Sequence, residues 1–147
     1  MAFSDIPARA NGETVLASWF NTIRTELVNW FGAGVISETQ DTIDNDASGE
    51  NVVGLSFSGT SYRSAKVQYQ VYRSDDSNTY AEAGQFFVVY NTVSSSWEIG
   101  GGVAAGNADI TFAITAAGQV TYTTGNMTGG SYAGYIRFKA ETLAVES

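Results

Sequence analysis

The side chains able to do chemistry in this chain are oxygen donors and aromatic rings, because the sequence contains no cysteine and no histidine. Disulfides and thiolate metal sites are therefore excluded, and so is the imidazole that serves most often as metal ligand and general base. Hydrolysis would have to rest on a pair of carboxylates, as in glycosidases. Asp75 and Asp76 are adjacent, and in a strand they would point to opposite faces. We interpret them as a solvated acidic turn and predict no enzymatic activity.

One acidic stretch matches the first half of a calcium-binding loop. Asp44, Asp46 and Ser48 alternate and Gly49 follows, as the oxygen ligands and the turn glycine do in such loops. The twelfth position is Leu55 rather than glutamate, and no helices are predicted beside it. We interpret the stretch as a solvated polar turn and predict neither a bound metal nor a cofactor.

Aromatic residues close to predicted turns are candidates for binding a glycan. An exposed ring can cover the apolar face of a sugar, while nearby Asn, Gln and Asp side chains bond its hydroxyl groups. The alternative is that these rings fill the core or the seams between subunits. The candidates are Tyr80, Trp97, Tyr132 and Tyr135.

The charge of the chain limits its partners. The formal net charge is −8, and the seven Lys and Arg residues are scattered, whereas nucleic-acid binding needs a concentrated basic surface. No apolar run approaches the length of a membrane span, so we expect no membrane insertion. The N-terminal sequence MAFSDIP has no basic region followed by an apolar run. We therefore expect no secretory signal and expect the chain to be made and folded in a cytosol.

Residues 11–32 predict one amphipathic helix, with Asn11 as its N-cap and Gly32 beyond its last turn. Burying the four large aromatic rings of its apolar stripe removes roughly 600–1,000 Å² from water, so another surface must cover them. That surface is either the sheet of the same chain or a copy of the helix or a neighbouring protein, and we favour the second. The predicted docking residues are Leu16, Trp19, Phe20, Ile23, Leu27, Trp30 and Phe31.

The rest of the chain predicts strands. Charged residues make up 15% of the sequence, below the roughly 25% usual in soluble domains, and polar uncharged residues replace them. Residues 65–72 and 134–145 alternate between apolar and polar, and 109–116 and 119–124 form a hairpin pattern. Residues 84–91 are nearly continuously apolar, which predicts a strand buried on both faces.

Short glycine- and serine-rich turns separate these runs. One of them is the run Gly100-Gly101-Gly102, which follows a short strand over 96–99 and which we read as a flexible turn. It is no phosphate loop, because no Lys-Ser/Thr follows it. The predicted fold is mostly β: an antiparallel β-sandwich or jelly roll of about seven to eight strands after one N-terminal amphipathic α-helix. The predicted organisation is a helical anchoring or oligomerisation segment (1–34), an acidic linker (35–53) and a β-sandwich domain (54–147).

Two parts of the sequence are similar to virion proteins of tailed bacteriophages. The N-terminal part resembles the start of tail-fibre and other virion proteins, in DIPAR (5–9), Asn11-Gly12 and ASWFNTIR (17–24). The C-terminal part is similar to small β-sandwich domains of such proteins, in YRSA (62–65), GQVTY (118–122) and IRFKAETL (136–143). The resemblance implies a helix that docks or trimerises and a β-domain displayed outward, and it carries over no catalytic residue.

The leading hypothesis is therefore a structural protein of the virion, a tail fibre or fibre-like component that forms a homotrimer and contacts other virion proteins. The chain is short for a complete tail fibre, and a head fibre, a capsid decoration or cement protein, or a collar component fits its length as well. A second hypothesis is a receptor module that binds host glycan, which is compatible with the first. An enzyme is the least favoured class.

Overall fold

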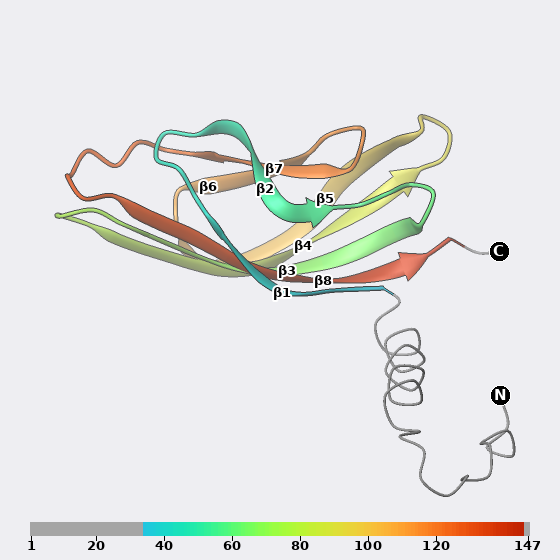
Figure 1. Ribbon diagram of the computed structural model, residues 1–147, viewed down its shortest axis with the longest axis horizontal. Coiled ribbons are helices and arrows are strands. Elements are labelled where there is room, and N and C mark those ends of the chain that lie inside the picture. Colours follow the sequence, from blue (N-terminus) through green and yellow to red (C-terminus); the bar gives the residue numbers. More distant parts are fainter. Residues whose placement is uncertain (1–33, 146–147) are drawn as a thin grey trace, which may run out of the picture. The chain divides into compact units, whose positions relative to one another are not determined.

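Eight antiparallel strands make up residues 34–145, the part of the chain that the computed structural model describes (Figure 1). The predicted helix and its seven docking residues lie outside this part. No helix within residues 34–145 is long and apolar enough to cross a membrane. The strands are β1 (Val35–Thr42), β2 (Ser48–Ser56), β3 (Tyr62–Ser74), β4 (Thr79–Asn91), β5 (Ser96–Asn107), β6 (Ile110–Ile114), β7 (Gln119–Thr124) and β8 (Ala133–Ala144).

The strands form two sheets packed face to face. The first sheet has five strands in the order β1-β8-β3-β4-β5, and the second has three in the order β2-β7-β6. Within the first sheet, β3, β4 and β5 are a meander, and β8 returns to lie beside β3, which is the Greek-key order. The β6–β7 hairpin that the sequence predicted is present, and Gly118 in its turn has φ +96°, a conformation that favours glycine. The predicted two-sheet β architecture is confirmed.

The core lies between the sheets and follows the alternation of the sequence. In β3, Val67 and Val71 are fully buried, and in β8, Ile136 and Phe138 are. Leu55 of β2 and Val120 of β7 meet them from the second sheet. In β2, β3 and β8 the neighbours of these residues along the strand point to solvent, as the period of two requires. In β7 the neighbour of Val120, Thr121, is also buried.

The segment predicted as an acidic linker is part of the sandwich. Residues 35–53 hold all of β1 and most of β2, and Val52 is fully buried. Both strands lie at the edge of their sheets, where polar and charged side chains reach solvent. Because such strands carry few apolar residues, the segment looked like a connection in the sequence.

Two further expectations about β4 and β5 were wrong. Residues 84–91 are not buried on both faces: Phe86 and Val88 face the core, whereas Phe87 and Val89 are 45% and 50% exposed. The glycine run 100–102 is not a flexible turn but part of β5, which extends to Asn107. Glycine is tolerated there because β5 is an edge strand and pairs with β4 through a register shift.

The two ends of the sandwich differ in what they contain (Figure 1). The loops that follow β1, β3, β5 and β7 gather at one end. At the opposite end, Val35 pairs with Glu141, and the Thr142 N–H donates to the Gly34 carbonyl. Gly34, the first of the described residues, therefore lies at the end opposite to these four loops.

Candidate functional site

The most elaborate polar structure of the described residues is at the end where the four loops gather, which we call the loop end. It comprises residues 43–47 between β1 and β2, 75–78 between β3 and β4, 108–109 between β5 and β6, and 125–132 between β7 and β8. A loop at the surface has no ladder of backbone hydrogen bonds to fix it. Two backbone bonds join these segments, from the Gly125 N–H to the Asp109 carbonyl and from the Asp76 N–H to the Gly130 carbonyl, and side chains supply further contacts.

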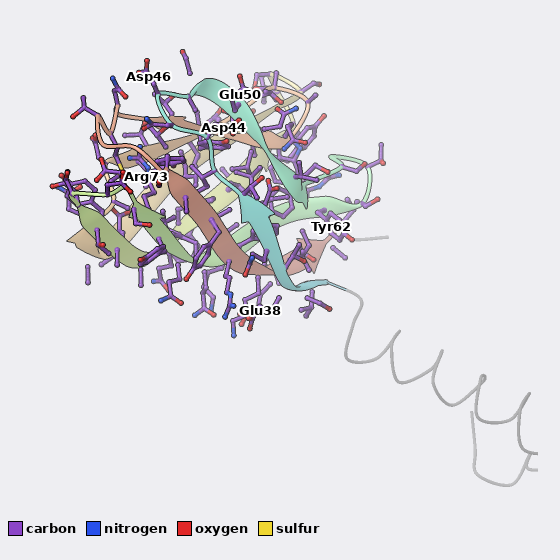
Figure 2. All side chains as sticks on the ribbon, turned by 60° about the vertical axis from the view of Figure 1, so that its left-hand side comes forward. Glu38, Asp44, Asp46, Glu50, Tyr62 and Arg73 are labelled. Carbon is purple, nitrogen blue, oxygen red and sulfur yellow. The ribbon has the colours of Figure 1, made fainter. Side chains whose placement is uncertain are left out.

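Arg73, at the end of β3, supplies five of them from a fully buried position (Figure 2). Its Nη1 donates to the carbonyls of Ala108 (2.8 Å) and Asp109 (3.0 Å). Its Nη2 donates to the Gly125 carbonyl and to Asn45 Oδ1, and its Nε donates to the Tyr132 hydroxyl at 3.1 Å. A guanidinium has five N–H groups, so these bonds use its full capacity. One side chain thus ties three of the loops to β3.

Asn45 clamps the loop that follows β7. Its Nδ2 donates to the Met127 carbonyl (2.7 Å) and to Asn126 Oδ1 (3.1 Å), while its Oδ1 accepts from the Met127 N–H at 2.8 Å. The Thr124 hydroxyl adds a bond to the Asp44 carbonyl. The loops after β1 and β7 are therefore held as one piece.

Asp75 holds the turn after β3 to the loop after β7 through hydrogen bonds. Its Oδ1 accepts from the N–H groups of Ser77 and Asn78, and its Oδ2 accepts from the Gly129 N–H at 2.8 Å. These bonds favour the charged carboxylate and lower the pKa of Asp75, the Ser77 bond most strongly and against the opposing effect of desolvation. An alanine Cβ at Gly129 would stand 2.4 Å from Asp75 Cγ, so only glycine fits there.

A fourth contact fixes the turn after β5. The Glu82 carboxylate accepts from the Tyr69 hydroxyl (2.7 Å) through one oxygen and from the Ala108 N–H (3.0 Å) through the other. Burial, and then the neighbouring carboxylate, raise the pKa of Tyr69 well above its ordinary value. The phenol therefore stays a hydrogen-bond donor at any physiological pH.

Between these fixed loops the surface is hollowed into a cavity of about 280 Å³. Its walls come from three of the four loop-end segments and the strand ends next to them. Asn126 shares its oxygen with Asn45, and Asn107 uses its Oδ1 to accept from the Asp109 N–H at 2.8 Å. The lining residues are Asn78, Tyr80, Asn107, Asp109, Asn126, Met127 and Thr128.

The glycan candidates of the sequence are not brought together. Tyr80 lines the cavity and is 38% exposed. Trp97 is a core residue, 4% exposed and in contact with the ring of Phe57, so the prediction that it meets a ligand was wrong. Tyr132 accepts a hydrogen bond from Arg73, and Tyr135 stacks on Tyr72 at a centroid distance of 5.3 Å on the outer side of the first sheet.

The sequence reasoning missed the amide residues of the cavity. Asn78, Asn107 and Asn126 each follow or precede a strand at a turn, and alternate turns of an antiparallel fold lie at the same end. That rule could have grouped them. As to a metal, no group of three Asp or Glu residues within 34–145 is close enough to hold one. In the calcium-like stretch, Asp46 sits in a turn at φ +55° and the Asp44 N–H donates to the Tyr122 hydroxyl.

A second unusual surface is the side of the five-stranded sheet that points away from the core, which we call the outer face. Phe87 and Val89 of β4 stand there, with Val103 of β5 opposite Gln85 and Leu143 of β8 opposite Ser64. Val103 and Leu143 are 68% and 69% exposed. Clusters of exposed apolar side chains are uncommon on isolated domains and mark interaction surfaces.

The outer face also differs in charge from the rest of residues 34–145. Residues 34–145 contain five basic side chains, and three of them, Lys66, Arg137 and Lys139, stand on the outer face. Lys66 pairs with Glu141 at 2.9 Å, and Glu38 projects from the same face (Figure 2). The bond to Lys66 lowers the pKa of Glu141. The outer face therefore mixes both signs, whereas the loops and the second sheet are acidic.

Comparison with known proteins gives a likeness among solved structures. No protein-family model matches the chain, and no curated protein matches it. Among solved structures, the tailspike protein of the Acinetobacter phage vB_ApiP_P1 is similar to it, with a TM-score of 0.46 and 14% sequence identity. The match covers 74% of this chain and 22% of the tailspike chain, so the chain spans about a fifth of that protein.

Proposed function

We propose that the chain is a structural protein of a bacteriophage particle, a tail fibre or fibre-like component with no enzymatic activity. In this proposal residues 1–34 anchor the protein in the particle or trimerise it, and the β-sandwich is displayed outward. The protein is made in the host cytoplasm and functions in the virion. Its partners are its own copies and other virion proteins.

The observation that carries the proposal is that the two ends of the sandwich differ. Gly34 lies beside Thr142 at one end of the sandwich, and the loops held by Arg73, Asn45 and Asp75 lie at the opposite end. A domain tethered at the first end presents the second end to solvent. The resemblance of residues 5–24 to the start of virion proteins supports the same assignment of anchor and displayed part.

The outer face supports self-association. Its apolar side chains need a cover, and its mixture of Lys66, Lys139, Glu38 and Glu141 allows a second copy to approach without like-charge repulsion. A partner with a strongly acidic surface would be repelled by the Glu38 and Glu141 carboxylates of this face. We propose that copies of the chain cover this face in a closed homotrimer, since homo-oligomers favour closed symmetry.

Two other roles remain as alternatives within the same proposal. A capsid decoration or cement protein would use the same anchor and sandwich on the head rather than the tail. A receptor module would add glycan binding at the displayed end, for which the cavity beside Tyr80 is a suitable place. The position in the particle separates the first alternative from a tail fibre.

The test is antibody labelling of intact purified particles, directed at the sandwich and viewed by electron microscopy. We expect label on the particle, and label confined to the tail supports a fibre or collar component, whereas label over the head supports decoration. Antibody preabsorbed with the purified full chain is the control. If mass spectrometry of purified particles does not detect the chain, the proposal is wrong.

A further inference from the structure

We propose that the cavity at the loop end binds an uncharged saccharide of one or two rings, with Tyr80 as the platform for a sugar face. This inference adds a ligand to the displayed end proposed above. It depends on the proposed function only in the point that the cavity faces outward from the particle. The binding chemistry itself is a property of the isolated chain. It follows from four observations on the residues that line the cavity.

The first observation is the pattern of unused hydrogen-bonding atoms. Asn126 and Asn107 each use Oδ1 within the protein, and within residues 34–145 no protein acceptor meets their Nδ2 groups. Asn78 uses Nδ2 to donate to Asp75, which leaves its Oδ1 unused. Each amide thus has one end fixed and the other end available. A fixed array of donors and acceptors is what vicinal sugar hydroxyls require, because each hydroxyl both donates and accepts.

The second observation is the exposed ring of Tyr80. It lies on the face of β4 that points toward the second sheet, and it borders the cavity rather than filling the core. An amphipathic ring beside polar groups matches the two kinds of surface that a pyranose offers. Met127, itself buried, also lines the cavity, and methionine is a polarisable apolar residue.

The third observation is rigidity. Arg73, Asn45 and Asp75 hold every loop that contributes a wall, through bonds that do not involve the unused amide atoms. The loops are therefore ordered before a ligand arrives, and binding does not have to order them. At about 280 Å³, the cavity is at the small end of ligand sites, which fits one or two sugar rings rather than a long chain.

The fourth observation is charge. Asp109 lines the cavity, and neither Lys nor Arg is among its lining residues. An anionic sugar would meet this carboxylate without a compensating cation, whereas an uncharged one can donate hydroxyl groups to it. The inference therefore excludes sialylated and sulfated glycans as the preferred ligands.

The experiment is a glycan array probed with the purified full chain, followed by titration of the best neutral binder by calorimetry. The array holds neutral oligosaccharides of glucose, galactose, mannose and N-acetylglucosamine beside sialylated and sulfated versions. Tyr80→Ala is the test variant, and Tyr135→Ala is its matched control, since Tyr135 is outside the cavity. We expect Tyr80→Ala to weaken binding about tenfold or more and Tyr135→Ala to leave it unchanged.

Asp109→Asn separates the charge argument from the stacking argument. We expect it to narrow the preference for neutral over sialylated glycans while keeping binding of the neutral one. The inference is overturned if no neutral glycan binds above background, if anionic glycans bind best, or if Tyr135→Ala abolishes binding and Tyr80→Ala does not. Particle labelling is measured separately, so a failure here is distinct from a failure of the virion assignment.

Discussion

The loop end and the outer face differ in how their backbone is held and in which side chains they present. At the loop end no ladder of strand hydrogen bonds fixes the backbone. The buried guanidinium of Arg73 and the side chains of Asn45 and Asp75 hold the loops instead, and mostly polar side chains surround the cavity. On the outer face the ladder of the sheet fixes the backbone without help, and long apolar and charged side chains stand free on it. The first surface is suited to a small polar ligand held in one geometry. The second is suited to a broad protein surface.

The largest expected effect is the loss of the central contact of the loop end. Arg73→Met removes five hydrogen bonds and leaves the buried Ala108 carbonyl without the guanidinium, which we expect to lower the free energy of unfolding by about 3–5 kcal/mol. Arg137→Met, on the outer face, should change it by less than about 0.5 kcal/mol. Urea denaturation of both variants makes the comparison. A loss below about 1 kcal/mol for Arg73→Met would show that the loops are held by other contacts.

The next effect compares the two faces of β4 at adjacent positions. Phe86 packs between Tyr69 and Phe112 in the core, so Phe86→Ala should lower the free energy of unfolding by about 3–5 kcal/mol. Phe87→Ala should change the unfolding of the dilute monomer by less than about 1 kcal/mol, because its ring is half-exposed. It should instead shift the assembly toward monomers in sedimentation velocity. An unchanged sedimentation profile would mean that Phe87 is not in a subunit contact.

The same pair of residues shows what the sequence could and could not predict. Alternation in β3 and β8 gave the faces of both strands correctly, because a period of two is a local property. The run over 84–91 carries no such period, and the sequence does not show that the second sheet has only three strands. Burial of the second face of β4 depends on what packs there, which is a tertiary property. The sequence therefore predicted the strand and misassigned one of its faces.

The candidate site was predicted less well than the fold. Tyr80 was identified because it is an aromatic residue next to a turn, but the same rule selected Trp97, which is buried. Arg73 drew no attention, since a single arginine after Tyr72 reads as an exposed strand residue. Its role exists only because three loops, separated by up to about eighty residues along the chain, converge on it. Contacts of that range leave no periodic signal.

A smaller effect tests how tightly the loop after β7 packs against the turn after β3. In Gly129→Ala the new Cβ meets the Asp75 carboxylate, and we expect a loss of about 1–3 kcal/mol in the free energy of unfolding together with weaker saccharide binding. Gly100→Ala is the matched control on β5, since no atom lies within 4 Å of its new Cβ. It should change stability by less than about 0.5 kcal/mol. Equal losses in both variants would contradict the fitted packing of the loop end.

The smallest effect concerns two carboxyl groups, one in each region, that both have lowered pKa values for different reasons. Backbone N–H groups lower the pKa of Asp75, whereas the Lys66 side chain lowers that of Glu141. Because the folded-state pKa is below the unfolded one, each group stabilises the fold above its unfolded pKa, near 4. That contribution disappears as the pH falls through the folded-state pKa.

Salt distinguishes the two causes. The exposed Lys66–Glu141 pair is screened, so 0.5 M NaCl should bring the pKa of Glu141 back toward its ordinary value. The bonds that Asp75 accepts are short and fixed by the loops, and its pKa should remain low at the same salt concentration. Carboxyl titrations followed by NMR at low and high salt measure both. If the pKa of Asp75 rises as much as that of Glu141, its turn is held by exposed charge rather than by hydrogen bonds, and the contrast between the two regions fails at this position.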